Sequence, residues 1–393
     1  MRARRSSGGR WALAGVLVVA ALASASACAT RADEDPLLGA AADETGEAGD
    51  TTTTTEGEGG TGEVQATARA LAQASERSTG EAHRFEMSMS MHAVGTGPGE
   101  RIDAEAPLMT GEQDGARYEV HMDMGQWIDE MMSSMPPEAG RNPLAGLDMT
   151  MDMAGDEQTF YIRAPMFAEL ADEAPPGADT GALDDLAVLG DQWGRVDIDE
   201  LGGFSLSEVQ GSVGGPGGSD PRVMLDLVAG AGDAEDLGAD QIDGTPVTGT
   251  RAQISLGAML EAQGVDPEQF SNQISANLGV GPGTNVHPDE LAERYLAIEI
   301  PFEVWVDDAG YVRRVSYEMD LLEMAGPSVD EGFGSGGTTE FTMGTTMDFS
   351  GYGDESIAVD FPPDAVDVTD AYREMLEANA AQAAAAAGNP VGS

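Results

Sequence analysis

The stretch of residues 298–321 constrains the fold more than any other, because apolar and polar residues alternate along it with a period of two. The apolar row of its first half consists of Ile298, Ile300, Phe302, Val304 and Val306. This alternation predicts a strand with one buried face, and residues 307–310 supply the turn that reverses the chain. On the return strand, one face is expected to hold Tyr311, Arg313, Val315, Tyr317, Met319 and Leu321. Val312 is expected on the opposite face. A hairpin with one apolar face must be covered on that side.

The same alternation returns elsewhere, and Met recurs at its apolar positions in residues 85–91, 118–124, 147–153 and 341–349. These segments read as half-buried strands. Further strands are expected at residues 158–163, 192–198, 222–228 and 247–256. The last of them follows Asp243-Gly244, a hairpin turn signal. The acidic cluster at residues 233–243 is expected to form solvated turns.

Helices are fewer in the sequence pattern than strands. They are expected at residues 63–77, 126–135, 166–171, 183–189, 256–263, 267–278 and 288–295, and from about residue 369 into the Ala-rich tract near the C-terminus. Roughly ten strands with mostly local neighbours and a few helical inserts indicate an α+β fold. We expect a large curved antiparallel sheet, a half-open barrel, with helices covering the concave face.

Charge and residue types exclude several classes of function. The chain has 70 acidic residues against 19 basic ones, a formal net charge of −51, so its surface repels nucleic acid. All 19 basic residues are Arg, which removes Schiff-base and P-loop lysines. The sequence has no H-E-x-x-H metal motif, no EF-hand loop and no G-x-S-x-G elbow, and nothing singles out a carboxylate pair for glycoside hydrolysis. We therefore expect no enzymatic activity, no metal ligands and no cofactor.

The N-terminus carries the features of an export signal. Arginines precede an apolar run at residues 11–23, and small residues follow it. Residues 25–28, ASAC, resemble the lipobox of bacterial lipoproteins, although Ala25 stands where Leu is commonest. Cys28 is the single cysteine of the chain, so it forms no internal disulfide. The sequence predicts lipidation of Cys28, and two or more acyl chains hold a protein stably on a membrane.

Composition then divides the chain into four parts. Residues 1–27 are expected to be a lipoprotein signal peptide, and residues 28–62 a disordered acidic tether rich in Thr and Gly. Residues 63–370 would form one folded domain, and residues 371–393 an Ala-rich tail that is helical or disordered. This organisation places the domain on the outer face of the cytoplasmic membrane, in the cell envelope.

The chain contains 21 methionines, which is unusual beside so few other large apolar residues. The simplest interpretation is core filling, since Met packs irregular gaps well. A second is a pliable cavity wall, because flexible thioethers adapt to varied apolar ligands. A third is Cu(I) binding by thioethers, which would fall when Met149 and Met151 are changed to Leu.

Taken together, these features resemble a known family. The lipobox at Cys28, the acidic tether, the leading helix and two segments, IDGTPVTGTRAQISL (residues 242–256) and VWVDDAGYVRRVSYEMDL (residues 304–321), look like the actinobacterial LppX/LprG-type lipoproteins, which are similar to LolA-like envelope carriers. The resemblance covers about residues 63–370. It implies an open half-barrel with helices on its concave face, an apolar cavity between them, and a role in binding or moving lipids through the envelope. It carries over no catalytic residues, and the extreme acidity and Met content depart from the family pattern.

Two function hypotheses follow. The first is a membrane-anchored envelope lipoprotein that binds a lipid or acylated ligand in an apolar cavity between sheet and helices. Envelope lipid transport is the role that this hypothesis suggests. Its expected cavity wall is Met87, Met89, Met91, Met149, Met151, Met153, Phe302, Val304, Tyr317, Met319, Phe341 and Met343. The alternative is an envelope sensor or adaptor with a solid core that binds a protein partner. The two differ in whether the interior holds a cavity.

The lipobox interpretation predicts the partition of the protein in detergent. The Cys28→Ala variant should move from the detergent phase to the aqueous phase of a Triton X-114 separation, because its acyl chains are lost. Ser26→Ala, two residues away, should leave the partition unchanged. A Cys28→Ala protein that stays in the detergent phase would show that Cys28 is not the anchor.

Overall fold

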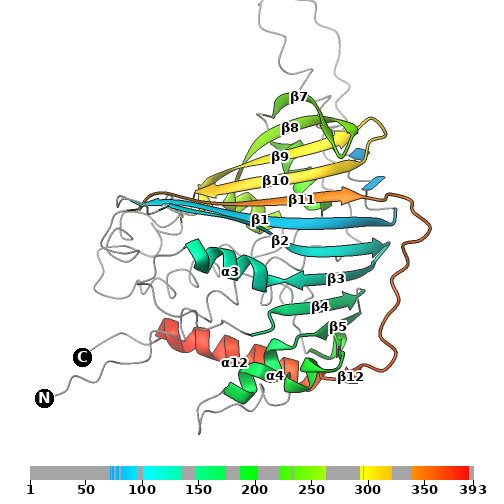
Figure 1. Ribbon diagram of the computed structural model, residues 1–393, viewed down its shortest axis with the longest axis vertical. Coiled ribbons are helices and arrows are strands. Elements are labelled where there is room, and N and C mark those ends of the chain that lie inside the picture. Colours follow the sequence, from blue (N-terminus) through cyan, green and yellow to red (C-terminus); the bar gives the residue numbers. More distant parts are fainter. Residues whose placement is uncertain are drawn as a thin grey trace, which may run out of the picture.

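The computed structural model describes residues 71, 73–74, 77–78, 81–95, 101–134, 147–156, 158–173, 186–201, 221–231, 234–262, 293–294, 296–320 and 338–388. Its centre is one twelve-stranded sheet, in the order β12-β6-β5-β4-β3-β2-β1-β11-β10-β9-β8-β7 (Figure 1). The sheet is open, because β12 and β7 are its two edges. All neighbours are antiparallel except the short pair of β12 with β6.

The strands are β1 (His83–Gly95), β2 (Arg101–Asp114), β3 (Arg117–Asp123), β4 (Thr150–Gly155), β5 (Thr159–Arg163), β6 (Gly194–Asp197), β7 (Glu235–Ile242), β8 (Thr245–Ser255), β9 (Glu299–Asp307), β10 (Val312–Asp320), β11 (Thr338–Ser350) and β12 (Val366–Asp367). Strands β1 to β6 form one meander and β7 to β11 form a second. The pairing of β1 with β11 joins them into a single sheet.

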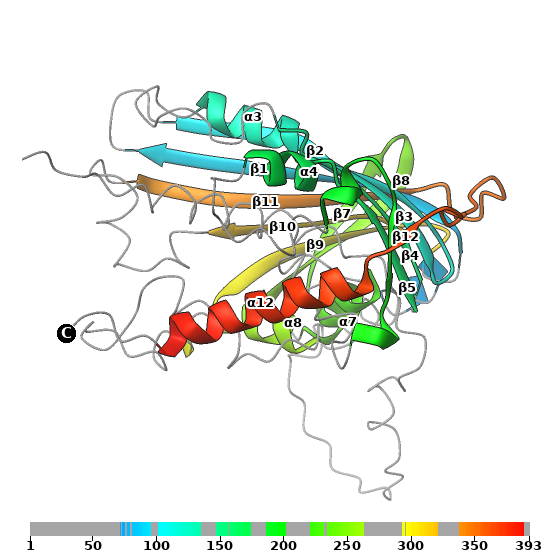
Figure 2. The same cartoon turned by 90° about the horizontal axis from the view of Figure 1, so that it is seen from below.

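The α-helices are α3 (Met124–Ser134), α4 (Met166–Glu173), α7 (Pro221–Gly230), α8 (Leu256–Ala262) and α12 (Thr369–Gly388), with short 3₁₀ turns η3 (Ala187–Gly190) and η4 (Asp199–Leu201). Helix α3 continues the line of β3 and lies beside β2 (Figure 1). Helix α7 packs against α8 and β8, and α12 packs against β6; all three helices are seen in the lower part of Figure 2. The leading helix is present at the described residues between 71 and 78, where Leu71 and Ala74 are buried.

One row of side chains shows how the strands are aligned. Residues that face each other across five adjacent strands, β4 to β1 and then β11, are all methionines, and all five are buried. We call them the central methionine row: Met151, Met122, Met109, Met87 and Met347. The row continues through Val315 and Val304 of β10 and β9, so one apolar line crosses most of the sheet.

The expected α+β architecture with a large antiparallel sheet is confirmed in its strands. Ten segments of the sequence predicted strands, and nine of them lie in the sheet. The hairpin at Asp243-Gly244 is confirmed as well, since both residues have positive φ, 50° and 78°, between the paired Ile242 and Thr245. Helices expected at residues 126–135, 166–171 and 256–263 are present as α3, α4 and α8. Residues 1–62, 267–278 and 288–292 lie outside the described part of the chain.

The strand expected at residues 222–228 is wrong, because this segment is helix α7. Leu225 and Val228, three positions apart, are both fully buried, which is the spacing of one helix face. Pro221 starts the helix at a position where its missing N–H costs nothing. Residues 223, 225 and 227 also alternate as a strand would, and the short run fits both periods.

The solvated turns expected at residues 233–243 are wrong too, because residues 235–242 form β7. Most of β7 is exposed, and hydrogen bonds to β8 hold it rather than burial of its side chains. It is an edge of the sheet, with Glu235, Asp236 and Asp240 exposed and a register shift at Gly238, whose φ is 81°.

Besides β7, two further strands were not expected from the sequence. Strand β2 carries the small residues Ala104 and Ala106 on its inward face and an exposed proline, Pro107, and a bulge opposite Met87 and Ser88 puts both Leu108 and Met109 inside. The bulge interrupts the alternation that a sequence pattern needs. Strand β12 has only two residues.

Val312 is buried, contrary to the face expected for it. The register of β10 against β9 shifts between Val312 and Arg314, so Arg313 leaves the ladder and Val312 turns inward. Arg313 instead pairs with Asp307, with 2.7 Å between Nε and Oδ2, and its guanidinium lies over the Tyr352 ring.

The close packing of β2 on β3 predicts the effect of one methyl group. A Cβ at Gly111 would lie 2.6 Å from the carbonyl oxygen of Glu119 and press on the Phe85 ring. Gly111→Ala should lower the free energy of unfolding by about 2 kcal/mol, because backbone must shift to admit it. The melting temperature should fall by about 4–8 °C.

Gly230→Ala is the matched control, since nothing lies within 4 Å of a Cβ at Gly230. Its melting temperature should stay within about 2 °C of the wild type. Equal stability of the two variants would contradict the β2–β3 register.

Candidate functional site

The inward face of the sheet is the candidate site. The central methionine row and its neighbours belong to one hydrophobic cluster that also includes buried residues of α3, α7, α8 and α12. Met87, Met151 and Met153 are at most 2% exposed. Phe302 and Val304 of β9 have no exposed surface. At its middle, therefore, the inward face is tightly packed in the described part of the chain.

A second methionine row crosses the sheet nearer to α3. Met91 of β1 faces Met343 of β11, which faces Met319 of β10. We call these three the outer methionine row. Met91 and Met319 are buried, but Met343 is only partly buried, and so is Phe341 at the start of β11. Two apolar side chains of β11 thus keep part of their surface exposed toward the end of the sheet where α3 begins.

Between the two rows lies an aromatic pair with a polar tip. The rings of Phe302 and Tyr317 stack with 4.9 Å between centroids. Burial raises the pKa of Tyr317, and a hydrogen bond with Thr345 opposes that shift. Thr345 pairs with Tyr317 across the strands and is itself buried. This part of the apolar face therefore holds hydroxyl groups among its thioethers.

The structure brings the expected cavity-wall residues onto one face. Nine of the twelve are buried, and Tyr317, Phe341 and Met343 are partly buried and packed against the same cluster. Their role as the wall of a cavity stays a prediction. Met109, Met122 and Met347 of the central row were not among the expected residues. Met122 and Met347 occupy the apolar positions of their alternating segments, which is the signal that could have found them. Cys28 lies outside the described residues.

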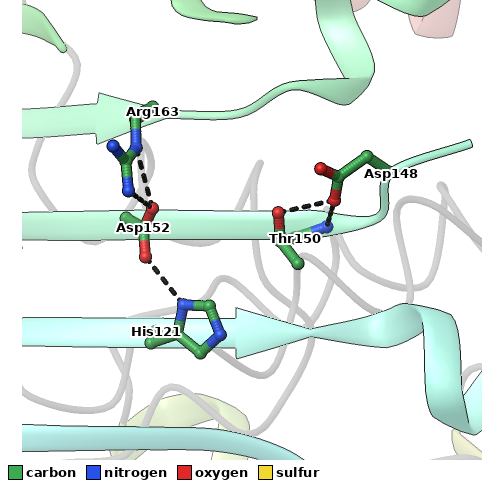
Figure 3. Close-up of polar contacts among 5 residues, drawn as sticks. All are labelled: His121, Asp148, Thr150, Asp152 and Arg163. Carbon is green, nitrogen blue, oxygen red and sulfur yellow. Dashed lines mark hydrogen bonds and ion pairs between the residues drawn. The ribbon is translucent and has the colours of Figure 1, made fainter. Parts of the chain in front are cut away.

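The outer face of the sheet is covered by cross-strand ion pairs. Asp152 of β4 accepts from His121 of β3 at 2.7 Å and from Arg163 of β5 at 2.9 Å (Figure 3). Arg314 with Asp348 and Arg84 with Glu112 repeat the pattern on neighbouring strands, at 2.6 and 2.8 Å. Each of these pairs is directly opposite in the register. Such pairs between partly exposed groups contribute little stability individually, and here they identify the solvent-exposed face of the sheet.

The start of β4 is fixed by a local turn. Asp148 Oδ1 accepts from the backbone N–H of Thr150 at 3.1 Å and from its hydroxyl at 2.6 Å (Figure 3). The turn sets Met149 and Met151 facing inward, while His121 and Asp152 face outward. His121 therefore lies on the opposite face of the sheet from the two methionines that copper binding would use. Among the described residues, no three His, Cys, Asp or Glu side chains are grouped to hold a metal ion.

A cluster of polar and aromatic residues lies at the start of β1, at the end of the sheet away from α3. The Tyr311 and Tyr352 rings stack at 4.6 Å, and Tyr352 donates to the Val312 carbonyl at 2.8 Å. Ser78 of the leading helix accepts from the Val312 N–H at 3.0 Å, which ties that helix to β10. Burial raises the pKa of Tyr352. This end of the sheet is thus held by directional bonds.

His83 lies inside this cluster and is 2% exposed. Its ring sits between Phe349 and Tyr352, with 5.9 and 5.1 Å between centroids. Nδ1 is 3.0 Å from the Glu81 carbonyl oxygen, and Nε2 is buried with no partner among the described residues. Burial lowers the pKa of His83 below its ordinary value, and the bond to Glu81 opposes this only in part.

None of the helices in the described part of the chain is long and apolar enough to span a membrane.

Comparison with known proteins adds distant likenesses of structure. In sequence, the chain matches no protein-family model, and it matches no curated protein. Among solved structures it is similar to LprF from Mycobacterium bovis, with 13% identity, a TM-score of 0.32, and coverage of 76% of this chain and 97% of that one. Lipoprotein LppX from Mycobacterium tuberculosis gives 12% identity, a TM-score of 0.32, and coverage of 76% and 100%. A LolA superfamily protein from Nitrosomonas europaea gives 9% identity, a TM-score of 0.18, and coverage of 75% and 94%. Likenesses this distant do not assign the chain to a family.

The environment of His83 predicts how stability depends on pH. Because its pKa is lowered, His83 takes up a proton at lower pH in the folded protein than in the unfolded chain, which does so as the pH falls below about 6.5. Stability from this group is therefore complete above pH 6.5 and is lost as the pH falls below it. His83→Phe should make the free energy of unfolding less steep between pH 7 and 5, by as much as about 1.4 kcal/mol per pH unit.

His121→Gln is the control, because His121 is exposed on the outer face. It should keep the wild-type decline on acidification, measured by urea unfolding at each pH. The assignment fails if His83→Phe declines with pH as steeply as the wild type.

Proposed function

We propose that this chain is a membrane-anchored envelope lipoprotein that binds a lipid or another acylated ligand between the sheet and its helices, in the manner of the LppX/LprG-type and LolA-like proteins that its sequence resembles. Lipidated Cys28 holds it on the outer face of the cytoplasmic membrane. The acidic tether of residues 28–62 lets the domain of residues 63–370 stand away from that surface or return to it.

The grading of burial along the inward face is the observation that supports this function best. The central methionine row is buried, but Met343 and Phe341 at the α3 end remain partly accessible beside Met91 and Met319. An apolar surface that opens at one end of a sheet suits a ligand whose acyl chains enter from that end. Flexible thioethers can repack around chains of different length.

The helices are proposed to cover the concave face without filling it. The large buried apolar side chains of three helices in the described residues are Leu225 and Val228 in α7, Leu256, Met259 and Leu260 in α8, and Tyr372 and Leu376 in α12. The last two also extend the packed part of the chain beyond residue 370, where we placed the start of the tail. Such modest covers can move aside for a ligand at lower cost than tightly interlocked helices.

A solid-core adaptor that binds a protein partner is the second candidate. The nearly complete burial of Met87, Met151 and Met153 favours it, since a filled interior leaves no room for a guest. Under this function the outer face and its excess of carboxylates would meet the partner. The two candidate functions differ in the role of the outer methionine row. The row contacts the ligand in the lipid-binding protein, whereas it packs against the protein's own core in the adaptor.

Uptake of a fluorescent fatty acid by the full Cys28→Ala chain separates the two candidates. The lipid-binding function predicts saturable uptake, and it predicts lipid in an organic extract of the purified protein by mass spectrometry. Met343→Asp should weaken uptake about tenfold, because it puts a charge where the acyl chain would enter.

Thr346→Asp is the matched control on the same strand. Thr346 lies on the outer face between Ser88 and Ser316, so the added charge stays in water. It should bind the fatty acid as the parent does. Absence of both uptake and co-purified lipid in a folded Cys28→Ala protein would overturn lipid binding and favour the adaptor.

A further inference from the structure

One hydrogen-bond donor inside the apolar cluster has no acceptor. Trp127 of α3 is 7% exposed, and its indole Nε1 is fully buried without a hydrogen-bond partner among the described residues. Buried N–H groups are almost always paired, because an unpaired one loses its bonds to water and gains nothing in return. His83 Nε2, also buried without a hydrogen-bond partner among the described residues, lies far from Trp127, in the aromatic cluster at the start of β1.

The position of Trp127 is set by the start of α3. The helix begins at Met124, whose N–H donates to the Met149 carbonyl at 3.2 Å. Met124, Trp127 and Ile128 form its buried face, at the spacing of one helical turn, while Gln126 and Asp129 are exposed. Helix α3 continues β3 at the end of the sheet where two apolar side chains of β11 keep part of their surface exposed (Figure 1).

The hydrophobic cluster that contains Trp127 consists almost entirely of side chains without a strong hydrogen-bond acceptor. Beside the start of α3 lie two buried methionines, Met122 near the end of β3 and Met149 just before β4, and a thioether sulfur accepts hydrogen bonds only weakly. Among the described residues, therefore, no oxygen accepts a hydrogen bond from the buried indole N–H of Trp127.

We propose that the Trp127 indole N–H donates a hydrogen bond to an acyl carbonyl oxygen of the bound lipid. This inference rests on the proposed lipid-binding function and narrows its ligand class to lipids whose chains are attached through ester or amide carbonyls. Such a carbonyl lies where the hydrocarbon begins, so a ligand that enters by its chains at the α3 end carries it to the depth of α3. A lipid with ether-linked chains would leave the donor unpaired.

Paired ligands test the proposal. A diacylglycerol and the dialkylglycerol ether of equal chain length differ in the carbonyls alone, and each can be titrated against a bound fluorescent fatty acid in the full Cys28→Ala chain. The ester lipid should bind about tenfold more tightly than the ether, because the ether leaves the indole donor unpaired. An N-acyl amide of the same chain length should bind like the ester.

Trp127→Phe should bind ester and ether alike, both with the affinity that the parent shows for the ether. Trp193→Phe is the matched control, since Trp193 lies with its ring against the Arg163 guanidinium on the outer face. It should keep the tenfold preference. If Trp127→Phe does not fold, the indole N–H signal of Trp127 in ¹⁵N NMR of the unchanged chain gives the same answer, because it should shift downfield with the ester and not with the ether.

The outcomes separate the two proposals. Equal affinity for ester and ether in the parent, or an indole N–H signal that does not shift when the ester binds, overturns the role of Trp127. Either result leaves the lipid-binding function unaffected. Failure to bind any of the three lipids or the fatty acid overturns the lipid-binding function itself.

Discussion

The pairing of β1 with β11 is the interaction on which the rest of this structure depends. It joins two meanders that are separate in the sequence, and it aligns Phe85 with Phe349 and Met87 with Met347. Because side chains alternate between faces, a slip of one residue in this pairing would turn every methionine of β1 toward water. The central and outer methionine rows exist only in the register observed. Since the paired segments lie far apart in the chain, forming the pair requires closure of a long loop, which is expected to make folding slow.

The two faces of the sheet divide the composition of the chain between them. Thioethers and aromatic rings gather inside, whereas several arginines of the outer face pair with a carboxylate of a neighbouring strand, as Arg314 pairs with Asp348 and Arg251 with Glu303. The carboxylates far outnumber the arginines, so most of the negative charge remains without a cationic partner. That excess keeps the molecule repelled from anionic surfaces and from its own copies. An acylated anchor would be the natural means of holding so acidic a domain near a membrane.

The sequence predicted those parts of the fold in which period and turn chemistry agree. The 298–321 hairpin and the Asp243-Gly244 turn were correct because alternation and positive-φ residues point to the same structure. Errors arose where a long-range partner decides the outcome. Residues 222–228 alternate like a strand but bury Leu225 and Val228 as a helix does, and β7 is a strand only because β8 lies beside it. The remaining errors come from β-bulges, because Val312 and Met109 lie on faces of their strands that strict alternation would not give them. For the candidate site, the pattern found the methionines that face inward but not Trp127, because an unpaired donor is visible only once its surroundings are known.

The exposed edge at β7 offers a row of backbone groups to which a further strand could add. A second copy approaching edge to edge would bring Glu235, Asp236 and Asp240 against the same carboxylates. The kink at Gly238 also bends the strand away from the straight template that an added strand needs. The open sheet therefore ends in a strand whose charge and bend both disfavour edge-to-edge association with a second copy.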